Sequence, residues 1–183
     1  MGSPFDEADA LSELGMVRRL TGDYPAAAAL QRQAFELFGQ LGDRLGQAWA
    51  FDELGLVQKM TGDYPGAEAT LRQALRWHRE LGSRHGEAKA LNSLGEVLTE
   101  TSATSEARDV HHQALAMARS LGAPLQEACA LEGIGRSLLR EDPFRAATYL
   151  REALAIYERI GSPDARRVLD TLSEHGLLIA PPG

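Results

Sequence analysis

The chain has 183 residues, of which 44% are apolar, and its formal net charge is −7 because 26 acidic residues outnumber 19 basic ones. This negative balance excludes a general affinity for nucleic acids or anionic membranes. A single cysteine excludes an internal disulfide, no apolar run approaches the roughly 20 residues that span a bilayer, and no signal peptide is visible, so we expect a cytoplasmic protein.

A repeat of 40 residues organises almost the whole chain. Gly15, Gly55, Gly95 and Gly135 lie 40 positions apart, and each follows an apolar residue. A fixed period of this length is typical of a solenoid built from stacked units. We therefore expect one array with units at 4–43, 44–83, 84–123 and 124–163, then a capping helix at 164–176 and a tail at 177–183.

Each unit is predicted to form a helical hairpin. The first helix is expected over residues 4–20, where Ser3 precedes a proline suited to a first helical turn. In the second unit, Asp43 is suited to cap a helix over 44–60 whose apolar residues recur at three-residue steps. After a Thr-Gly pair, Asp63 caps a second helix that ends near a left-handed glycine.

The repeated small residues indicate close packing inside each hairpin. Gly55 lies in the middle of a predicted helix, where glycine costs about 1 kcal/mol relative to alanine. Ala67 and Ala74 are seven residues apart and share one face of the second helix. We therefore expect the two helices to approach each other closely at Gly55.

The two ends of the array differ. Asp164 is suited to cap a helix over 165–174, and Val168, Leu169 and Leu172 are expected to face the last hairpin. No such capping helix is expected to cover the first helix of the array. A homodimer formed through the array ends is therefore one expectation.

The order of apolar and small residues in each unit resembles the tetratricopeptide repeat (TPR). The first unit has Leu11, Leu14, Gly15, Ala27 and Ala34, and the order recurs at positions 51, 54, 55, 67 and 74 and at 91, 94, 95, 107 and 114. Positions 131, 134, 135, 146 and 153 fit it after deletion of one residue in a turn. The resemblance covers about residues 4 to 163 and implies an all-α, right-handed superhelix of four hairpins.

The 40-residue period departs from the family's usual 34 residues. This longer form resembles the arrays of Pins/LGN-type scaffolds. Through the phrase Leu-Thr-Gly-Asp-Tyr-Pro it also resembles arrays at the C-terminal end of actinobacterial regulators that carry a nucleotide-binding switch domain. The second likeness implies a sensing or partner-binding arm, although the sequence shows no glycine-rich phosphate loop.

By family resemblance, the first helix of each hairpin lines a concave groove. Its residues that do not pack the hairpin differ between units, which suits either one asymmetric partner or drift on a solvated surface. The candidate ligand-binding residues are Glu13, Met16, Trp49, Asp52, Glu53, Leu56, Lys59, Lys89, Asn92, Glu96, Cys129, Glu132 and Arg136. Asp9, Ser12, Arg19, Ser93, Thr99 and Arg140 are assigned to the same surface.

Charge and aromatic character suggest what this groove binds. Glu13, Asp52 and Glu53 place carboxylates in its first half, which predicts a ligand with basic groups there. Trp49 offers a large apolar area with a polar handle and could anchor a ligand. The alternative for Trp49 is packing against the neighbouring helix.

Catalytic and metal-binding sites are not expected. His111 and His112 are adjacent and point about 100° apart on a helix, unlike the i,i+4 pair of a helical zinc site. We expect His111 to be buried structure and His112 to be exposed. Cys129 has no histidine placed near it by the repeat, and the adjacent carboxylates of Asp52 and Glu53 diverge instead of converging on one substrate.

The sequence therefore favours a non-catalytic protein- or peptide-binding scaffold without a cofactor. A second interpretation is a sensing or regulatory arm of a larger transcriptional or signalling regulator. A small-molecule-binding or enzymatic helical-repeat protein is a more distant alternative.

Overall fold

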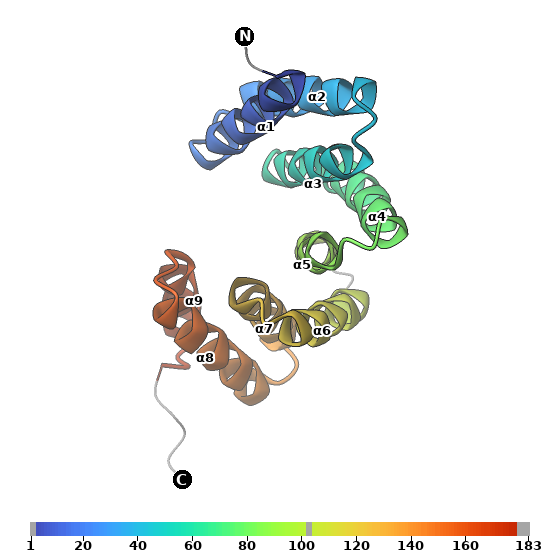
Figure 1. Ribbon diagram of the computed structural model, residues 1–183. Coiled ribbons are helices and arrows are strands. Elements are labelled where there is room, and N and C mark those ends of the chain that lie inside the picture. Colours follow the sequence, from blue (N-terminus) through green and yellow to red (C-terminus); the bar gives the residue numbers. More distant parts are fainter. Residues whose placement is uncertain (1–2, 102–103, 179–183) are drawn as a thin grey trace.

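The computed structural model describes residues 3–101 and 104–178, and within them the chain forms nine helices and no strand (Figure 1). This confirms the expected all-α solenoid. The helices are α1 (Pro4–Leu20), α2 (Tyr24–Gln40), α3 (Arg44–Met60), α4 (Tyr64–Glu80), α5 (Arg84–Glu100), α6 (Thr104–Leu121), α7 (Pro124–Leu138), α8 (Pro143–Arg159) and α9 (Asp164–Glu174). None of these helices is long and apolar enough to cross a membrane.

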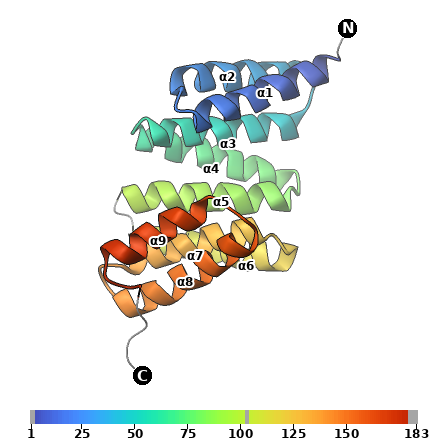
Figure 2. The same cartoon turned by 90° about the vertical axis from the view of Figure 1, so that its left-hand side faces the viewer.

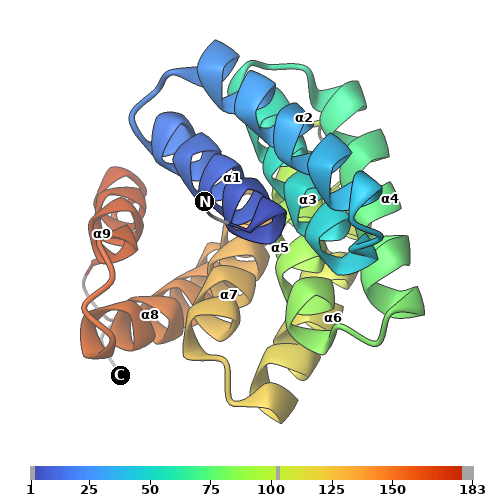
Figure 3. The same cartoon turned by 45° about the horizontal axis from the view of Figure 1, so that its top comes forward.

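The helices form two layers along a curved array. The inner layer consists of α1, α3, α5, α7 and α9, and the outer layer consists of α2, α4, α6 and α8 (Figures 1 and 2). Each helix packs against the next one in the chain, and α1–α3, α3–α5 and α5–α7 also touch within the inner layer. Seen from the N-terminal end, α1 and α9 lie at the two ends of the concave side (Figure 3). The inner layer therefore carries the concave surface expected of the first helix in each hairpin.

The turns follow the predicted capping chemistry. Gly62 adopts a φ of +81°, which glycine reaches without strain, and Gly82 does the same at +66°. Asp63 then caps α4 by accepting a hydrogen bond from the Gly66 amide at 3.0 Å. Ser3 caps α1 in a reciprocal bond pair with Asp6. These local signals place the helix boundaries where the sequence predicted them.

The packing glycines each receive one large side chain from the outer helix of the same hairpin. A Cβ added at Gly55 would lie 2.6 Å from Leu71 Cγ, and one at Gly135 would lie 2.7 Å from Leu150 Cγ. Gln31 occupies the equivalent place at Gly15, and His111 occupies it at Gly95. All four of these outer-helix side chains are fully buried. The close approach predicted at Gly55 thus has a defined partner in every unit.

We predict that Gly55→Leu overpacks the second hairpin, because Leu71 already fills the space that any side chain at position 55 would need. The free energy of unfolding should fall by about 1–3 kcal/mol or more, measured by urea denaturation. Ala69→Leu is the matched control, since Ala69 is exposed on α4. A Gly55→Leu protein as stable as this control would contradict the packing.

His111 is a buried histidine that fills the space between two units. It is fully buried, and an added Cβ at Gly133 on α7 would lie only 2.2 Å from its ring. Its Nδ1 lies 3.4 Å from the Asn92 side-chain oxygen, whereas its Nε2 has no hydrogen-bond partner. Burial lowers the pKa of His111 to about 4. The expectation that His111 is structural and His112 exposed is confirmed.

The low pKa of His111 predicts a pH-dependent stability. Between pH 6.5 and about 4 the unfolded chain binds a proton at His111 that the folded chain does not, so acid favours unfolding. Stability is complete above pH 6.5 and falls by about 3 kcal/mol toward pH 4. His111→Leu places there the side chain that the second unit has at Leu71. Urea denaturation across this range should show a shallower pH dependence for the variant, and identical slopes would contradict the assignment.

The C-terminal end of the array is closed by α9. Val168 and Leu172 are buried against the last hairpin, and Leu169 is partly buried. One detail of the expectation was wrong, because the N-cap position is Pro163 and Asp164 is the first helical residue. Leu177 packs back onto the core. Residues 179–183 of the predicted tail lie outside the described residues.

Candidate functional site

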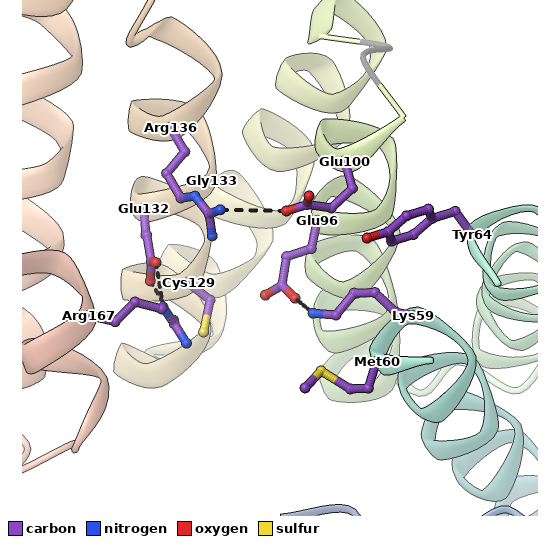
Figure 4. A pocket seen from close by; sticks show the side chains of 10 residues that line it. All are labelled: Lys59, Met60, Tyr64, Glu96, Glu100, Cys129, Glu132, Gly133, Arg136 and Arg167. Atoms are coloured by element: carbon purple, nitrogen blue, oxygen red, sulfur yellow. Dashed lines mark hydrogen bonds and ion pairs between the residues drawn. The ribbon is translucent and has the colours of Figure 1, made fainter. Parts of the chain in front are cut away.

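A pocket of about 380 Å³ opens on the concave surface where α3, α5, α7 and α9 converge. Figure 4 shows charged side chains from these four helices pointing into it. Its lining residues are Lys59, Met60, Tyr64, Glu96, Glu100, Cys129, Glu132, Gly133, Arg136 and Arg167. Five of the predicted groove residues are therefore brought together in one place, namely Lys59, Glu96, Cys129, Glu132 and Arg136.

Ion pairs join the inner helices around this pocket. Lys59 on α3 pairs with Glu96 on α5, and the Arg136 guanidinium on α7 lies 3.5 Å from a Glu100 oxygen on α5 (Figure 4). Every pair links two different helices of the inner layer. The charges of opposite sign that the sequence interleaves along the groove thus neutralise one another across helices.

Among the ion-paired carboxylates at the pocket, Glu132 is the most buried. Glu132 is 3% exposed and accepts two hydrogen bonds from Arg167 of α9, both 2.7 Å long. Its second oxygen also accepts the Tyr157 hydroxyl at 3.0 Å. Three donors thus satisfy the hydrogen-bonding capacity of this buried carboxylate without a ligand. Glu132 therefore fixes α9 to α7, and both Glu132 and Arg167 line the pocket.

A second charged group ties together the first three inner helices. Glu53 accepts from Arg19 of α1 at 2.9 Å and from Lys89 of α5 at 2.8 Å. Burial opposes ionisation of this carboxyl, but Lys89 and Arg19 outweigh that effect and hold the pKa of Glu53 below its usual range. Lys89 also lies 5.2 Å above the centre of the Trp49 ring. These predicted ligand-binding residues are thus engaged with each other.

Asp52 does not reach the groove, contrary to its assignment as a ligand-binding residue. It is fully buried between α3 and α4, where one carboxylate oxygen lies 2.8 Å from His78 Nε2. Desolvation raises the pKa of Asp52 even though the His78 hydrogen bond acts against that shift. The side chain therefore belongs to the interior of the second hairpin.

Asn92 is also a packing residue. It is 3% exposed, and its side-chain amide donates to the Gln126 backbone oxygen of α7 at 2.9 Å. A buried amide bound in this way joins successive units. Its predicted role in ligand binding would require this bond to break.

A smaller pocket of about 290 Å³ lies at the N-terminal end of the concave surface, between α1 and α3. Asp9, Glu13 and Trp49 line it. Within the described residues, neither Asp9 nor Glu13 has an ion-pair partner, and both are exposed. Trp49 is half-buried and packs edge-on against His78 with ring centres 4.8 Å apart. Packing thus accounts for part of the Trp49 surface, and the rest borders this pocket.

The remaining predicted residues lie along the same surface. Met16 is exposed on α1, and Leu56 is half-buried on α3. Reasoning from the repeat overlooked Tyr64 and Arg167, because it considered only the first helix of each hairpin and treated α9 as a cap. Within the described residues, no cluster of His, Cys, Asp and Glu side chains is suited to hold a metal ion.

Comparison with known families explains this architecture. Tetratricopeptide repeat family models match residues 6–80 and 88–122. The chain carries tetratricopeptide repeats. Residues 6–80 span the first two hairpins of this TPR array, and 88–122 span most of the third. No protein of curated function matches the sequence.

Solved structures share the fold of the TPR array at low sequence identity. A Rap protein crystallised with competence and sporulation factor is 18% identical with a TM-score of 0.85, over 96% of this chain and 50% of that one. Aspartyl phosphate phosphatase F from Bacillus subtilis is 12% identical with a TM-score of 0.83, over 97% of this chain and 47% of that one. The TPR array thus spans about half the length of these relatives.

A third structure carries a similar array as part of a larger protein. It is a signal transduction ATPase with numerous domains (STAND protein) from Pyrococcus horikoshii that has a tetratricopeptide repeat sensor. It is 15% identical with a TM-score of 0.74, over 95% of this chain and 27% of that one.

We predict that the thiol of Cys129 in the TPR array reacts slowly. Burial raises its pKa to about 12, so little thiolate is present at pH 8. Alkylation by iodoacetamide at pH 8 should be roughly a hundredfold or more slower in the native protein than in urea, where the pKa returns to its ordinary value. Mass spectrometry of quenched samples measures both rates, and equal rates would contradict a buried thiol.

Proposed function

We propose that this chain is a non-catalytic binding module that holds a protein or peptide segment along its concave surface. The observation that carries this proposal is that the two pockets of that surface differ in whether their charged side chains are paired. Its N-terminal pocket has carboxylates without ion-pair partners at Asp9 and Glu13, whereas the charges around the larger pocket are paired. An asymmetric surface of this kind favours one orientation of an extended ligand.

The chemistry of the N-terminal pocket supports a ligand with basic groups there. An arginine or lysine side chain between Asp9 and Glu13 would gain charge-assisted hydrogen bonds at little desolvation cost, because both carboxylates are exposed. Trp49 borders the same pocket and would add apolar contact area. The larger pocket then accommodates side chains further along the segment.

The resemblance to solved structures adds support of a general kind. The Rap protein of similar fold was crystallised with competence and sporulation factor, which shows that a related helical array is found in a complex. The inference that this chain also binds a partner rests on the shared shape of the array alone.

The experiment is a selection of binding peptides from a random display library, followed by fluorescence anisotropy with the best sequence. We expect the selected peptides to be rich in lysine and arginine. Glu13→Lys should weaken binding at least tenfold, which is about 1.4 kcal/mol. Glu36→Lys makes the same charge change at an exposed residue of the outer helix α2 and should leave affinity unchanged.

Two results would contradict the proposal. One is the selection of peptides without basic residues, and the other is an equal loss of affinity in the Glu13 and Glu36 variants. The second result would show that only net charge matters. Circular dichroism of both variants establishes that the array remains folded.

A second candidate function is that of a sensing arm in a larger regulator, as the sequence resemblance to nucleotide-switch regulators suggests. The structural likeness to the STAND protein favours it, because a TPR sensor accounts for only part of that protein. An open reading frame that joins this array to a nucleotide-binding domain would support this role.

A further inference from the structure

The first helix has an apolar surface that no other helix covers. On α1, Leu14 is 44% exposed and Val17 is 50% exposed, and Ala10 between them is exposed as well. α1 is the first helix of the array (Figure 1), and it packs against α2 and α3. We call Ala10, Leu14 and Val17 the α1 end face.

The repeat shows what this surface is built to contact. In the third unit the residues in register with the end face are Ala90, Leu94 and Val97, and each is at most 1% exposed. They belong to one buried cluster with Leu71 and Leu75 of α4, the outer helix of the preceding unit, which packs against α5. The α1 end face therefore has the composition of an internal interface and lacks its covering helix within the described residues.

Charge at the edge of this face indicates the covering partner. Glu7 and Arg18 are eleven residues apart, which is about three helical turns, so they lie along the same edge of α1. Arg18 makes one loose contact of 3.7 Å with Asp23 and remains about half exposed. When two copies of α1 meet antiparallel around a twofold axis near residue 12, Glu7 of each lies opposite Arg18 of the other.

The same axis brings the apolar residues together. Leu14 of one copy then lies against the small Ala10 of the second copy. A large residue packs against a small one in the same way inside the array, where Leu71 lies against Gly55. Head-to-tail stacking lacks this fit, because the outward side of α9 carries the exposed charges of Arg166, Asp170 and Glu174. A contact in which both copies use the same surface is complete once two copies have met, so it forms a dimer and no larger assembly.

We propose that the α1 end face binds the same face of a second copy, which forms an antiparallel, twofold-symmetric dimer. This contact lies outside the concave groove and is independent of the proposed function. Because the contact is made by one helix face of each copy, it is small for a specific interface, and we expect a reversible dimer that depends on concentration.

Sedimentation velocity over a concentration series tests the dimer. The wild-type mass should rise toward twice the monomer mass of 19.8 kDa. Val17→Asp should remain monomeric throughout, because it places a carboxylate on the apolar end face, close to Glu7 of the second copy. Phe144→Asp is the matched control, since Phe144 is 70% exposed on the distant α8 and should not affect the mass.

Charge reversal tests the orientation. Glu7→Arg and Arg18→Glu should each weaken dimerisation at least tenfold, because each places like charges opposite one another. The double variant Glu7→Arg/Arg18→Glu should restore it. A wild-type protein that is monomeric at every concentration would overturn the proposal, and so would a double variant no better than the single ones. Circular dichroism shows whether each variant is folded.

Discussion

The close contact between a glycine of each inner helix and a buried side chain of its outer partner is the constraint on which the rest of the structure depends. Leu71 against Gly55 and Leu150 against Gly135 leave no room for a Cβ, so the distance between the two helices is set at these points. The same contact recurs in each unit with a 40-residue period. Regular spacing inside the hairpins then determines how the units stack and how the inner layer curves.

This packing restricts which inner-helix residues can bind a partner. Residues on the hairpin side are buried, and many of the others contact the next inner helix. Glu53 shows the result, because it bridges α1 and α5 through Arg19 and Lys89. A ligand that uses such a charge must replace an existing ion pair, so paired charges contribute more to selectivity than to affinity. The unpaired carboxylates at Asp9 and Glu13 carry no such cost.

Local signals explain why so much of the fold was predictable from the sequence. The helix over 44–60 is bounded by Asp43 and by a Thr-Gly pair, and these act on the adjacent backbone alone. The close approach at Gly55 also followed from the sequence, since a mid-helix glycine needs a packing reason.

The burial and pairing of the charged residues were not predictable, because they depend on partners far away in the chain. Asp52 is buried by His78, which is 26 residues away on another helix. Glu132 is held by Arg167, which is 35 residues away. Spacing within one helix shows which residues share a side, but it does not show which neighbour covers that side. The inner layer carries the concave surface that the sequence implied, but Asp52 and Asn92 are buried in its packing, and Glu132 both pairs with Arg167 and lines the pocket.

The Glu132–Arg167 pair connects the end of the array to its larger pocket. Arg167 belongs to α9, and its side chain both holds α9 on α7 and borders the pocket. Because repeat arrays are stabilised by contacts between neighbours, detachment of a terminal helix is the least costly opening such an array has. Detachment of α9 would remove one wall of the pocket and leave the buried Glu132 carboxylate with Tyr157 as its remaining donor. A segment bound in that pocket would therefore also hold α9 in place, so binding and closure of the C-terminal end are linked through a single side chain.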